Sequence, residues 1–245
     1  MTEYLKRFRD KMAGEDTRLY LLEEVDSTNT FAKSLRGSQS AVVLAARQTG
    51  GRGRWGRAWN GQPDDLYMSL YYSSPVKDLL GLTLIAALAV VDTVDKFCEG
   101  VGIKWPNDIL VHGKKLVGIL AESVFLGREP QAVVIGVGIN VNADGFEGEL
   151  AQKAISIKMA SGRLADTAEV AFCLKKNMDR YFSEFCREGF APMLSSYTER
   201  SVMIGRQVTV FNKCGICRGF SDRGGILLQQ GETPIEEAYF GEASF

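Results

Sequence analysis

The residues best suited to chemistry lie in residues 48–59, which read Gln-Thr-Gly-Gly-Arg-Gly-Arg-Trp-Gly-Arg-Ala-Trp. This glycine-arginine loop holds four glycines and three arginines. An arginine guanidinium stays ionised and binds phosphate or carboxylate oxygens through paired hydrogen bonds, and glycines let the backbone close around a small anion. We therefore expect the loop to form a lid over a phosphorylated or carboxylated ligand.

The charge distribution concentrates positive charge around this loop. Residues 27–63 contain six Lys and Arg and no Asp or Glu, whereas the rest of the chain carries 23 basic against 30 acidic residues. Because the net charge is only −1, the whole molecule has no general attraction for nucleic acid or membrane. A solvated surface loop and an Arg-Gly nucleic-acid tail are the alternatives, and the second is disfavoured because such tails lie in low-complexity segments.

Part of the loop also matches a dinucleotide fingerprint. Residues 51–56 fit G-x-G-x-x-G, and a strand is expected just before them. In that fingerprint the glycine turn opens a helix. Here the alternating strand 66–72 follows instead, so a dinucleotide site is not favoured.

A second polar segment is Asp26-Ser-Thr-Asn29, and all four residue types are good helix caps. A helix over residues 30–35 needs only one cap. Capping and contact with a polar ligand therefore remain open for this segment.

Two further segments place charged and amide groups together. Residues 104–108, Lys-Trp-Pro-Asn-Asp, combine a cation, an amide and a carboxylate, which suits Mg²⁺-bound phosphate or a turn closed by Asn and Asp. After Gly113, one of Lys114 and Lys115 must point to the inner face of the following strand, and alternation does not say which. In residues 133–142, glycines allow a close neighbour and two asparagines mark the polar end.

Periodicity predicts strands and helices around these segments. We expect helices over 4–12, 30–35 and 78–99 and a long helix after the cap Asp166, with strands over 19–22, 41–47, 66–72, 103–105, 114–125 and 133–141. From about residue 201, short strands over 207–211, 217–220, 226–229 and 235–239 suggest a small β-barrel.

Composition bounds the remaining possibilities. The 245 residues, 45% apolar and 24% charged, suit one large domain or a large and a small one. The N-terminus has no apolar signal core, so we expect a cytoplasmic protein. Five scattered cysteines predict free thiols, and Cys214 and Cys217 lack the second ligand pair of a zinc site. The single His112 has no neighbouring metal-ligand motif.

Five motifs together resemble those of the biotin–protein ligases. In chain order they are Asp-Ser-Thr-Asn at 26–29, Gly-Arg-Gly-Arg-Trp-Gly-Arg-x-Trp at 51–59, Lys-Trp-Pro-Asn-Asp at 104–108, Lys-Leu-x-Gly-Ile-Leu at 115–120 and Gly-Val-Gly-Ile-Asn at 136–140. The resemblance implies an α+β fold with a central mixed β-sheet and helices over residues 1–197, as in class II synthetase-like catalytic domains. A small SH3-like β-barrel is then expected over residues 198–245.

The resemblance also implies a reaction and its site. ATP and biotin would form biotinyl-5′-AMP, and the biotinyl group would pass to a lysine of a biotin carboxyl carrier domain, such as that of acetyl-CoA carboxylase. The implied catalytic residues are Lys115 and Arg54. The implied biotin-binding residues are Ser27, Thr28, Asn29, Gln48, Arg52, Gly53, Arg54, Lys115 and Gly118. The implied ATP or adenylate residues are Arg54, Trp59, Lys104, Asn107, Asp108 and Asn140, with Asp108 as a Mg²⁺ ligand.

Some family members carry an N-terminal DNA-binding domain of about sixty residues, and here only about twenty residues precede the matching core. DNA binding is therefore not expected, and the net charge of −1 gives no reason to expect membrane association. A lipoate–protein ligase is the closest alternative, and a non-catalytic binding module is the alternative from another class. The sequence does not decide between a monomer and a homodimer.

Overall fold

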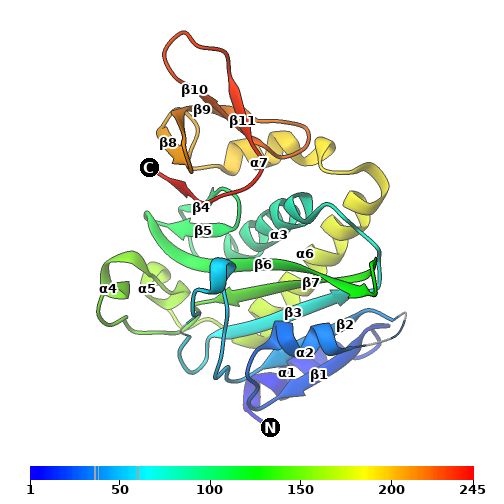
Figure 1. Cartoon of the computed structure of the whole chain (residues 1–245). Helices are drawn as coiled ribbons and strands as arrows, with labels where there is room; N and C mark the ends of the chain where they lie inside the picture. The colour runs from blue at the N-terminus through cyan, green and yellow to red at the C-terminus, as the bar shows by residue number, and fades with distance from the viewer. Residues whose placement is uncertain (36, 38, 60) are drawn as a thin grey trace.

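The computed structural model describes residues 1–35, 37, 39–59 and 61–245, so Arg36, one of the basic residues counted above, lies outside the described residues. Its centre is a seven-stranded mixed sheet in the order β1-β2-β3-β7-β6-β5-β4 (Figure 1). The strands are β1 Arg18–Leu22, β2 Ala41–Ala45, β3 Leu66–Tyr72, β4 Val101–Lys104, β5 Asp108–Val111, β6 Lys114–Leu126 and β7 Glu129–Ile139. All six strands expected in this part of the chain are confirmed.

The sheet is mixed because β1 pairs in parallel with β2, whereas the pairings among the remaining described strands are antiparallel. Its central strands are buried on both faces, as their apolar sequences require: every residue of β2 and β3 is buried. The glycine-arginine loop joins these two strands, as expected, and ends in a strand rather than a helix. This connection excludes the dinucleotide fold that its glycine pattern resembles.

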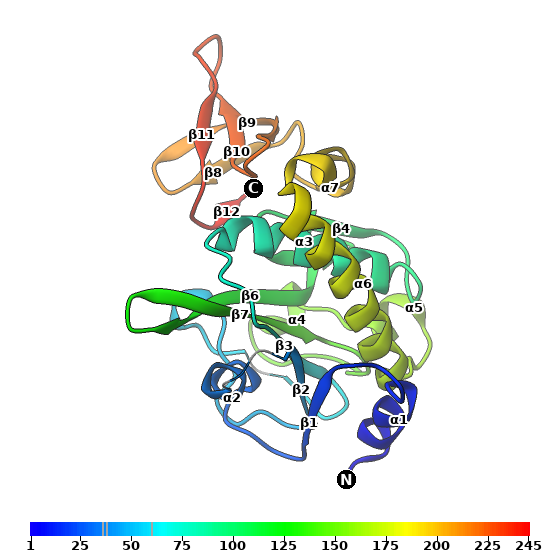
Figure 2. The same cartoon turned by 90° about the vertical axis from the view of Figure 1, so that its right-hand side faces the viewer.

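Helices cover both faces of the sheet (Figure 2). On one face α3 Leu79–Val94 packs on the strands and against α6 Thr167–Glu188, and α1 Glu3–Lys11 packs on α6. On the other face lies the short helix α2 Thr28–Ser34. The helix expected over 78–99 ends earlier, because hydrogen bonds from Lys96 N to Thr93 O (3.3 Å) and Phe97 N to Val94 O (2.8 Å) tighten its last turn.

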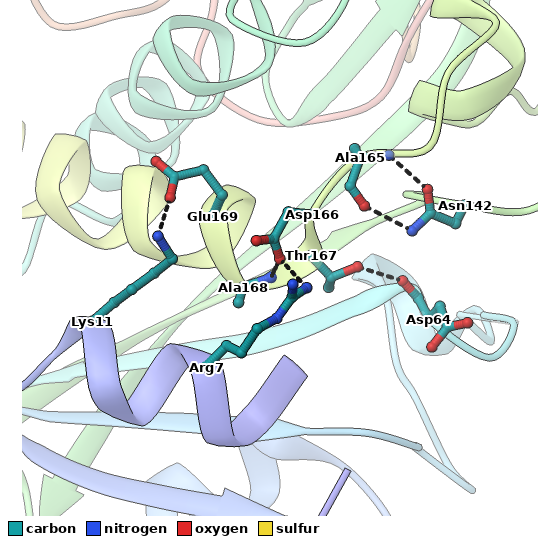
Figure 3. Close-up of polar contacts among 9 residues, drawn as sticks. All are labelled: Arg7, Lys11, Asp64, Asn142, Ala165, Asp166, Thr167, Ala168 and Glu169. Atoms are coloured by element: carbon teal, nitrogen blue, oxygen red, sulfur yellow. Dashed lines mark hydrogen bonds and ion pairs between the residues drawn. The ribbon is translucent and has the colours of Figure 1, made fainter. Parts of the chain in front are cut away.

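The N-terminus of α6 joins distant parts of the chain (Figure 3). Asp166 caps the helix by accepting a hydrogen bond from Ala168 N at 2.9 Å, and Arg7 of α1 binds the same carboxylate at 2.6 Å. Glu169, in the first turn of the same helix, forms an ion pair with Lys11. The expected cap is confirmed, and its charged groups hold α1 against α6.

Asn142, just after β7, has a structural role in the same region (Figure 3). Its side chain accepts a hydrogen bond from Ala165 N and donates one to Ala165 O, both at 3.0 Å. The amide therefore closes the segment between β7 and α6, which contains two short helices that periodicity did not predict, α4 Leu150–Lys153 and α5 Ile157–Ser161.

The C-terminal segment forms a second, five-stranded antiparallel sheet in the order β11-β10-β9-β8-β12. After η2 Ala191–Met193 and α7 Leu194–Arg200 come β8 Gln207–Val210, β9 Lys213–Phe220, β10 Ile226–Gln229, β11 Glu236–Ala238 and β12 Ala243–Ser244. Trp105, just after β4, links the C-terminal sheet to the main sheet, because its buried indole Nε1 donates to Gly224 O at 3.0 Å. The five cysteines are free thiols, as predicted.

Candidate functional site

Two adjoining hollows lie beside the glycine-arginine loop, and Figure 1 shows the loop's short helix η1 Arg54–Gly56 beside β6 and β7. Their volumes are ≈ 130 Å³ and ≈ 690 Å³, and both are lined by Trp59, Asp108 and Lys115. The other residues named from the sequence divide between them. The first is lined by Ser27, Thr28, Asn29, Gln48, Arg52, Gly53, Arg54, Asn107 and Gly118, and the second by Lys104 and Asn140. The structure therefore brings all the expected site residues together.

The loop is closed by its own backbone. Gly53 N donates to Arg57 O at 2.7 Å, and Trp59 N donates to Gly51 O at 2.9 Å. Gly50 N donates to Asp26 O at 2.7 Å, which joins the loop to the start of α2. A Cβ atom on Gly51 would lie 2.8 Å from the carbonyl oxygen of Trp59, so the loop needs glycine at this close approach.

Arg54 extends from this loop into the first hollow. Its Nη1 donates to Asn107 Oδ1 at 3.0 Å, and Asn107 Nδ2 donates to Ile119 O of β6 at 3.2 Å. Burial lowers the pKa of the guanidinium, but from a value so high that it remains a cation. Asn107 thus fixes a positive charge in the hollow.

Lys115 brings a second positive charge to the boundary between the two hollows. Its Nζ lies 2.7 Å from Asp108 Oδ1 and 5.7 Å from the centroid of the Trp59 ring. Asn140 holds the lysine's backbone in place, because its Nδ2 donates to Lys115 O at 3.4 Å and to Ile155 O at 3.1 Å. The amide of Asn140 therefore fixes the backbone that carries the Lys115 side chain.

Trp59 lies over a floor of paired glycines. Gly118 of β6 and Gly138 of β7 are partners across the two strands. A Cβ atom would come within 2.7 Å of the Trp59 ring at Gly118 and within 2.6 Å at Gly138. The indole Nε1 is buried, and among the described residues it has no hydrogen-bond partner. The glycines admit the flat ring, as the sequence suggested, and the indole leaves a donor for a ligand.

At the polar end of the first hollow, one residue of the segment 26–29 caps α2, and contact of the others with a ligand stays a prediction. Ser27 is the cap, because its Oγ accepts from Thr30 N at 3.4 Å. Thr28 turns inward instead: its backbone N and its Oγ1 lie 2.8 Å and 3.0 Å from Gln48 Oε1. Asn29 is also buried and lines the hollow. Ser27 thus caps α2, and all three residues line the hollow.

Glu242 is a site residue that the sequence reasoning missed. Its carboxylate oxygens lie 2.7 Å and 2.6 Å from the two Nη atoms of Arg57, and it lines both hollows. The Arg57 hydrogen bond also lowers the pKa of the Glu242 carboxyl. No local pattern marks a contact between residues so far apart in the chain. The pair connects the C-terminal sheet to the glycine-arginine loop.

A buried carboxylate, Asp65, joins the exit of the glycine-arginine loop to the exit of β7. It accepts hydrogen bonds from Gln62 N and Val141 N, both at 2.8 Å, and is fully buried. Burial raises the pKa of this carboxyl from 3.8 to about 6. One side chain thus holds the ends of two segments that border the site.

Comparisons with known proteins agree with this geometry. Residues 21–140 match the Biotin/lipoate A/B protein ligase family. A biotin–[acetyl-CoA-carboxylase] ligase of Paracoccus denitrificans is 32% identical, with the similarity covering 90% of this chain and 100% of the relative. The chain belongs to the biotin–protein ligases. The bifunctional ligase/repressor BirA of Bacillus spizizenii is 33% identical over 95% of this chain and 75% of its own length.

A solved member of the family has the same fold. The biotin protein ligase from Aquifex aeolicus in complex with biotin and ATP has a TM-score of 0.84 and 30% sequence identity, covering 93% of this chain and 97% of that one. In the described ranges, no group of three or more His, Cys, Asp or Glu side chains is arranged to hold a metal ion. The described helices include none long and apolar enough to cross a bilayer.

Proposed function

We propose that this biotin–protein ligase joins biotin to ATP as biotinyl-5′-AMP and then passes the biotinyl group to a lysine of a biotin carboxyl carrier domain. The observation that carries the proposal is that the two hollows share Trp59, Asp108 and Lys115, so that a hydrogen-bonding end and the cations of Arg54 and Lys115 line one joined site. The carrier belongs to acetyl-CoA carboxylase, by analogy with the name of the Paracoccus relative.

In the first step the biotin carboxylate is itself the nucleophile, so the protein must supply positive charge and not a nucleophile of its own. A biotin carboxylate oxygen bonds to the α-phosphorus of ATP, the bond to the β-phosphate oxygen breaks, and pyrophosphate leaves. The carboxylate and the α-phosphate are both anions and must approach each other. Fixed cations lower the barrier most at the reacting α-phosphate, where negative charge concentrates. Arg54 and Lys115 supply these cations. In the second step the carrier lysine amine attacks the biotinyl carbonyl carbon, and AMP leaves.

Magnesium fits the nucleotide side of the site. Mg²⁺ is commonly held by one or two carboxylates together with substrate phosphates, so a dedicated cage of protein ligands is not needed. Asp108, which lines both hollows, is the carboxylate that would hold it. The ion would neutralise phosphate charge.

We also propose a boundary near residues 197 and 198, an SH3-like barrel for the C-terminal sheet, and a cytoplasmic location.

The test is the intact mass of a biotin carboxyl carrier domain after incubation with the chain, ATP and Mg²⁺. A gain of one biotinyl unit with biotin, and none without ATP, is the expected result. Parallel pyrophosphate-release assays with biotin, lipoate or neither distinguish the biotin ligase from a lipoate ligase and from a binding module. Release with lipoate alone, or with neither acid, would contradict the proposal.

The glycine-arginine loop is expected to resist trypsin when biotin and ATP are bound. Its glycines give the free loop high conformational entropy, and ordering costs about 1 kcal/mol or more per residue, which contact with the anion must offset. The measurement is the rate of cleavage after Arg52 or Arg54 with and without ligands. Arg128, exposed in the turn between β6 and β7, is the internal reference. Equal protection at Arg128 would point to a general effect instead.

Gly138→Ala is expected to raise the KM for ATP about tenfold, because overpacking by one methyl group costs about 1–3 kcal/mol and here falls on the Trp59 ring. The KM is measured by pyrophosphate release. Gly145→Ala is the matched control, since a Cβ atom there meets no heavy atom within 4 Å. A Gly138→Ala enzyme with the parent KM would mean that Trp59 does not flank the nucleotide.

A further inference from the structure

A chain of hydrogen bonds runs from the polar end of the first hollow to a charged pair behind its wall. Asn29 Nδ2 donates to Glu122 Oε2 at 2.8 Å and to Leu120 O at 3.3 Å. Glu122 Oε1 in turn lies 2.5 Å from Lys33 Nζ. Neither Glu122 nor Lys33 lines either hollow. In the described part of the chain, Asn29 is a hydrogen-bonded link between this charged pair and the hollow.

The same chain continues from Asn29 toward Gln48 through two hydroxyl groups. Ser69 Oγ is fully buried and lies 2.6 Å from Asn29 Oδ1 and 2.8 Å from Thr28 Oγ1. Thr28 Oγ1 lies 3.0 Å from Gln48 Oε1. A carboxylate can only accept hydrogen bonds, so Glu122 requires the amide NH₂ of Asn29 to face it. The amide oxygen of Asn29 must then face Ser69.

The orientation of the Asn29 amide determines which group holds each proton in this series of hydrogen bonds. A hydroxyl has one proton, and that of Ser69 is directed to Asn29 Oδ1. The hydroxyl of Thr28 donates its proton to Ser69 Oγ or to Gln48 Oε1. Toward a ligand, the same hydroxyl can therefore only accept a hydrogen bond. Gln48 Oε1 already accepts from Thr28 N, which leaves Gln48 Nε2 as a donor. The hollow therefore presents an acceptor beside a donor.

Packing prevents the Asn29 amide from moving away. A Cβ atom on Gly136 would lie 2.0 Å from Asn29 Oδ1, 2.7 Å from its Cγ and 2.9 Å from its Nδ2. The amide therefore occupies the space where a side chain at position 136 would lie, directly against β7. With Glu122 on one side and Ser69 on the other, the amide has one orientation that satisfies all its partners.

We propose that Glu122, paired with Lys33, is a positioning residue that fixes the orientation of the Asn29 amide at the polar end of the hollow and, through it, the arrangement of the Ser69 and Thr28 hydroxyls. This inference rests on the proposed function and concerns the selectivity of the hollow for biotin over lipoate. The acceptor of Thr28 and the donor of Gln48 fit a cyclic urea, which has N–H donors beside a carbonyl acceptor. The dithiolane ring of lipoate has neither group, so the same wall disfavours lipoate.

The test compares Glu122→Gln with a double variant that exchanges the charges, Lys33→Glu with Glu122→Lys. A glutamine can present either NH₂ or oxygen, so the orientation of Asn29 is no longer enforced. The exchanged pair keeps an ion pair, but a lysine at position 122 can only donate and so requires the opposite orientation of Asn29. Both variants are expected to raise the KM and the calorimetric Kd for biotin about tenfold, with the KM for ATP and the melting temperature close to the parent values.

The exchange separates positioning from a simple structural ion pair. If biotin affinity returns to the parent value in the double variant, the ion pair alone matters and the proposal is overturned. Equal increases in the KM for biotin and for ATP would overturn it as well. Exchange of the remote pair Glu15 and Lys176, which are 2.8 Å apart, is the control and should leave both constants unchanged.

Direct binding keeps this test independent of the proposed function. Failure of the parent chain to release pyrophosphate would refute the ligase reaction, yet calorimetry would still measure the effect of Glu122 on biotin binding. An unchanged Kd in Glu122→Gln would refute the inference while the ligase reaction stands.

Discussion

Lys115→Ala is expected to lower pyrophosphate exchange about 100- to 1,000-fold, since removing one preorganised electrostatic stabiliser typically costs roughly 3 to 4 kcal/mol of barrier. The ammonium of Lys115 lies where the two hollows meet, beside Asp108 and the face of Trp59. Its backbone pairs in β6 and receives the Asn140 amide, and both contacts survive in alanine. Folding should therefore change little, with a melting temperature close to that of the parent.

Lys114→Ala is the matched control, because Lys114 precedes Lys115 in β6 and lines neither hollow. It is expected to keep pyrophosphate exchange near the parent rate. Equal losses in the two variants, or no loss at Lys115, would show that the reactive charge has been assigned to the wrong lysine.

The choice between these lysines shows where local sequence rules stop. Alternation along a strand says that two neighbours face opposite sides, but the register of β5 with β6 shifts between Ile109 and Leu110. Such an irregularity beside Lys114 and Lys115 has no signature in hydrophobic periodicity. The resemblance named Lys115, and the structure places its ammonium at the site.

The strands of the main sheet were predictable because their signal is local. Apolar alternation marks β3, and continuous apolar runs mark β2 and β7, whatever their partners are. By contrast, β5 and α4 have four residues each, too few for a period to be recognised. Tertiary contacts stabilise such short elements. Length alone does not explain why they were missed, since β4 is equally short and was predicted; the local sequence of β5 and α4 simply carries no recognisable period.

The site was predictable where a motif is contiguous and not where it is assembled by folding. Arg54, Trp59 and Asp108 lie in recognisable segments and meet as expected. Glu242 lines the site, and Ser69 and Glu122 contact residues that line it, each from a strand or turn whose sequence looks ordinary. Their roles depend on pairing across the sheet and on the position of the C-terminal segment, which no single stretch of sequence encodes.

The pH dependence of stability is expected to show the cost of burying Asp65. Its native pKa of about 6 lies above its ordinary value of 3.8, so the unfolded chain releases this proton first as pH rises. Asp65 therefore lowers the free energy of unfolding progressively between those two values, by about 3 kcal/mol in all, of which about 2 kcal/mol falls between pH 4 and pH 7. Above about pH 6 the effect is complete.

Asp65→Asn isolates this effect because asparagine does not titrate. Gln62 N and Val141 N donate to different oxygens of Asp65, and asparagine keeps only one oxygen, so the variant should be less stable than the parent at pH 4. As pH rises to 7, its stability relative to the parent should improve by about 2 kcal/mol, because only the parent then holds a buried charge. Urea unfolding at both pH values measures the difference, and Asp64→Asn at the exposed neighbouring position should show little change. A difference for Asp65→Asn that is independent of pH would mean that the native carboxylate is stabilised by the two backbone N–H groups as well as water stabilises it.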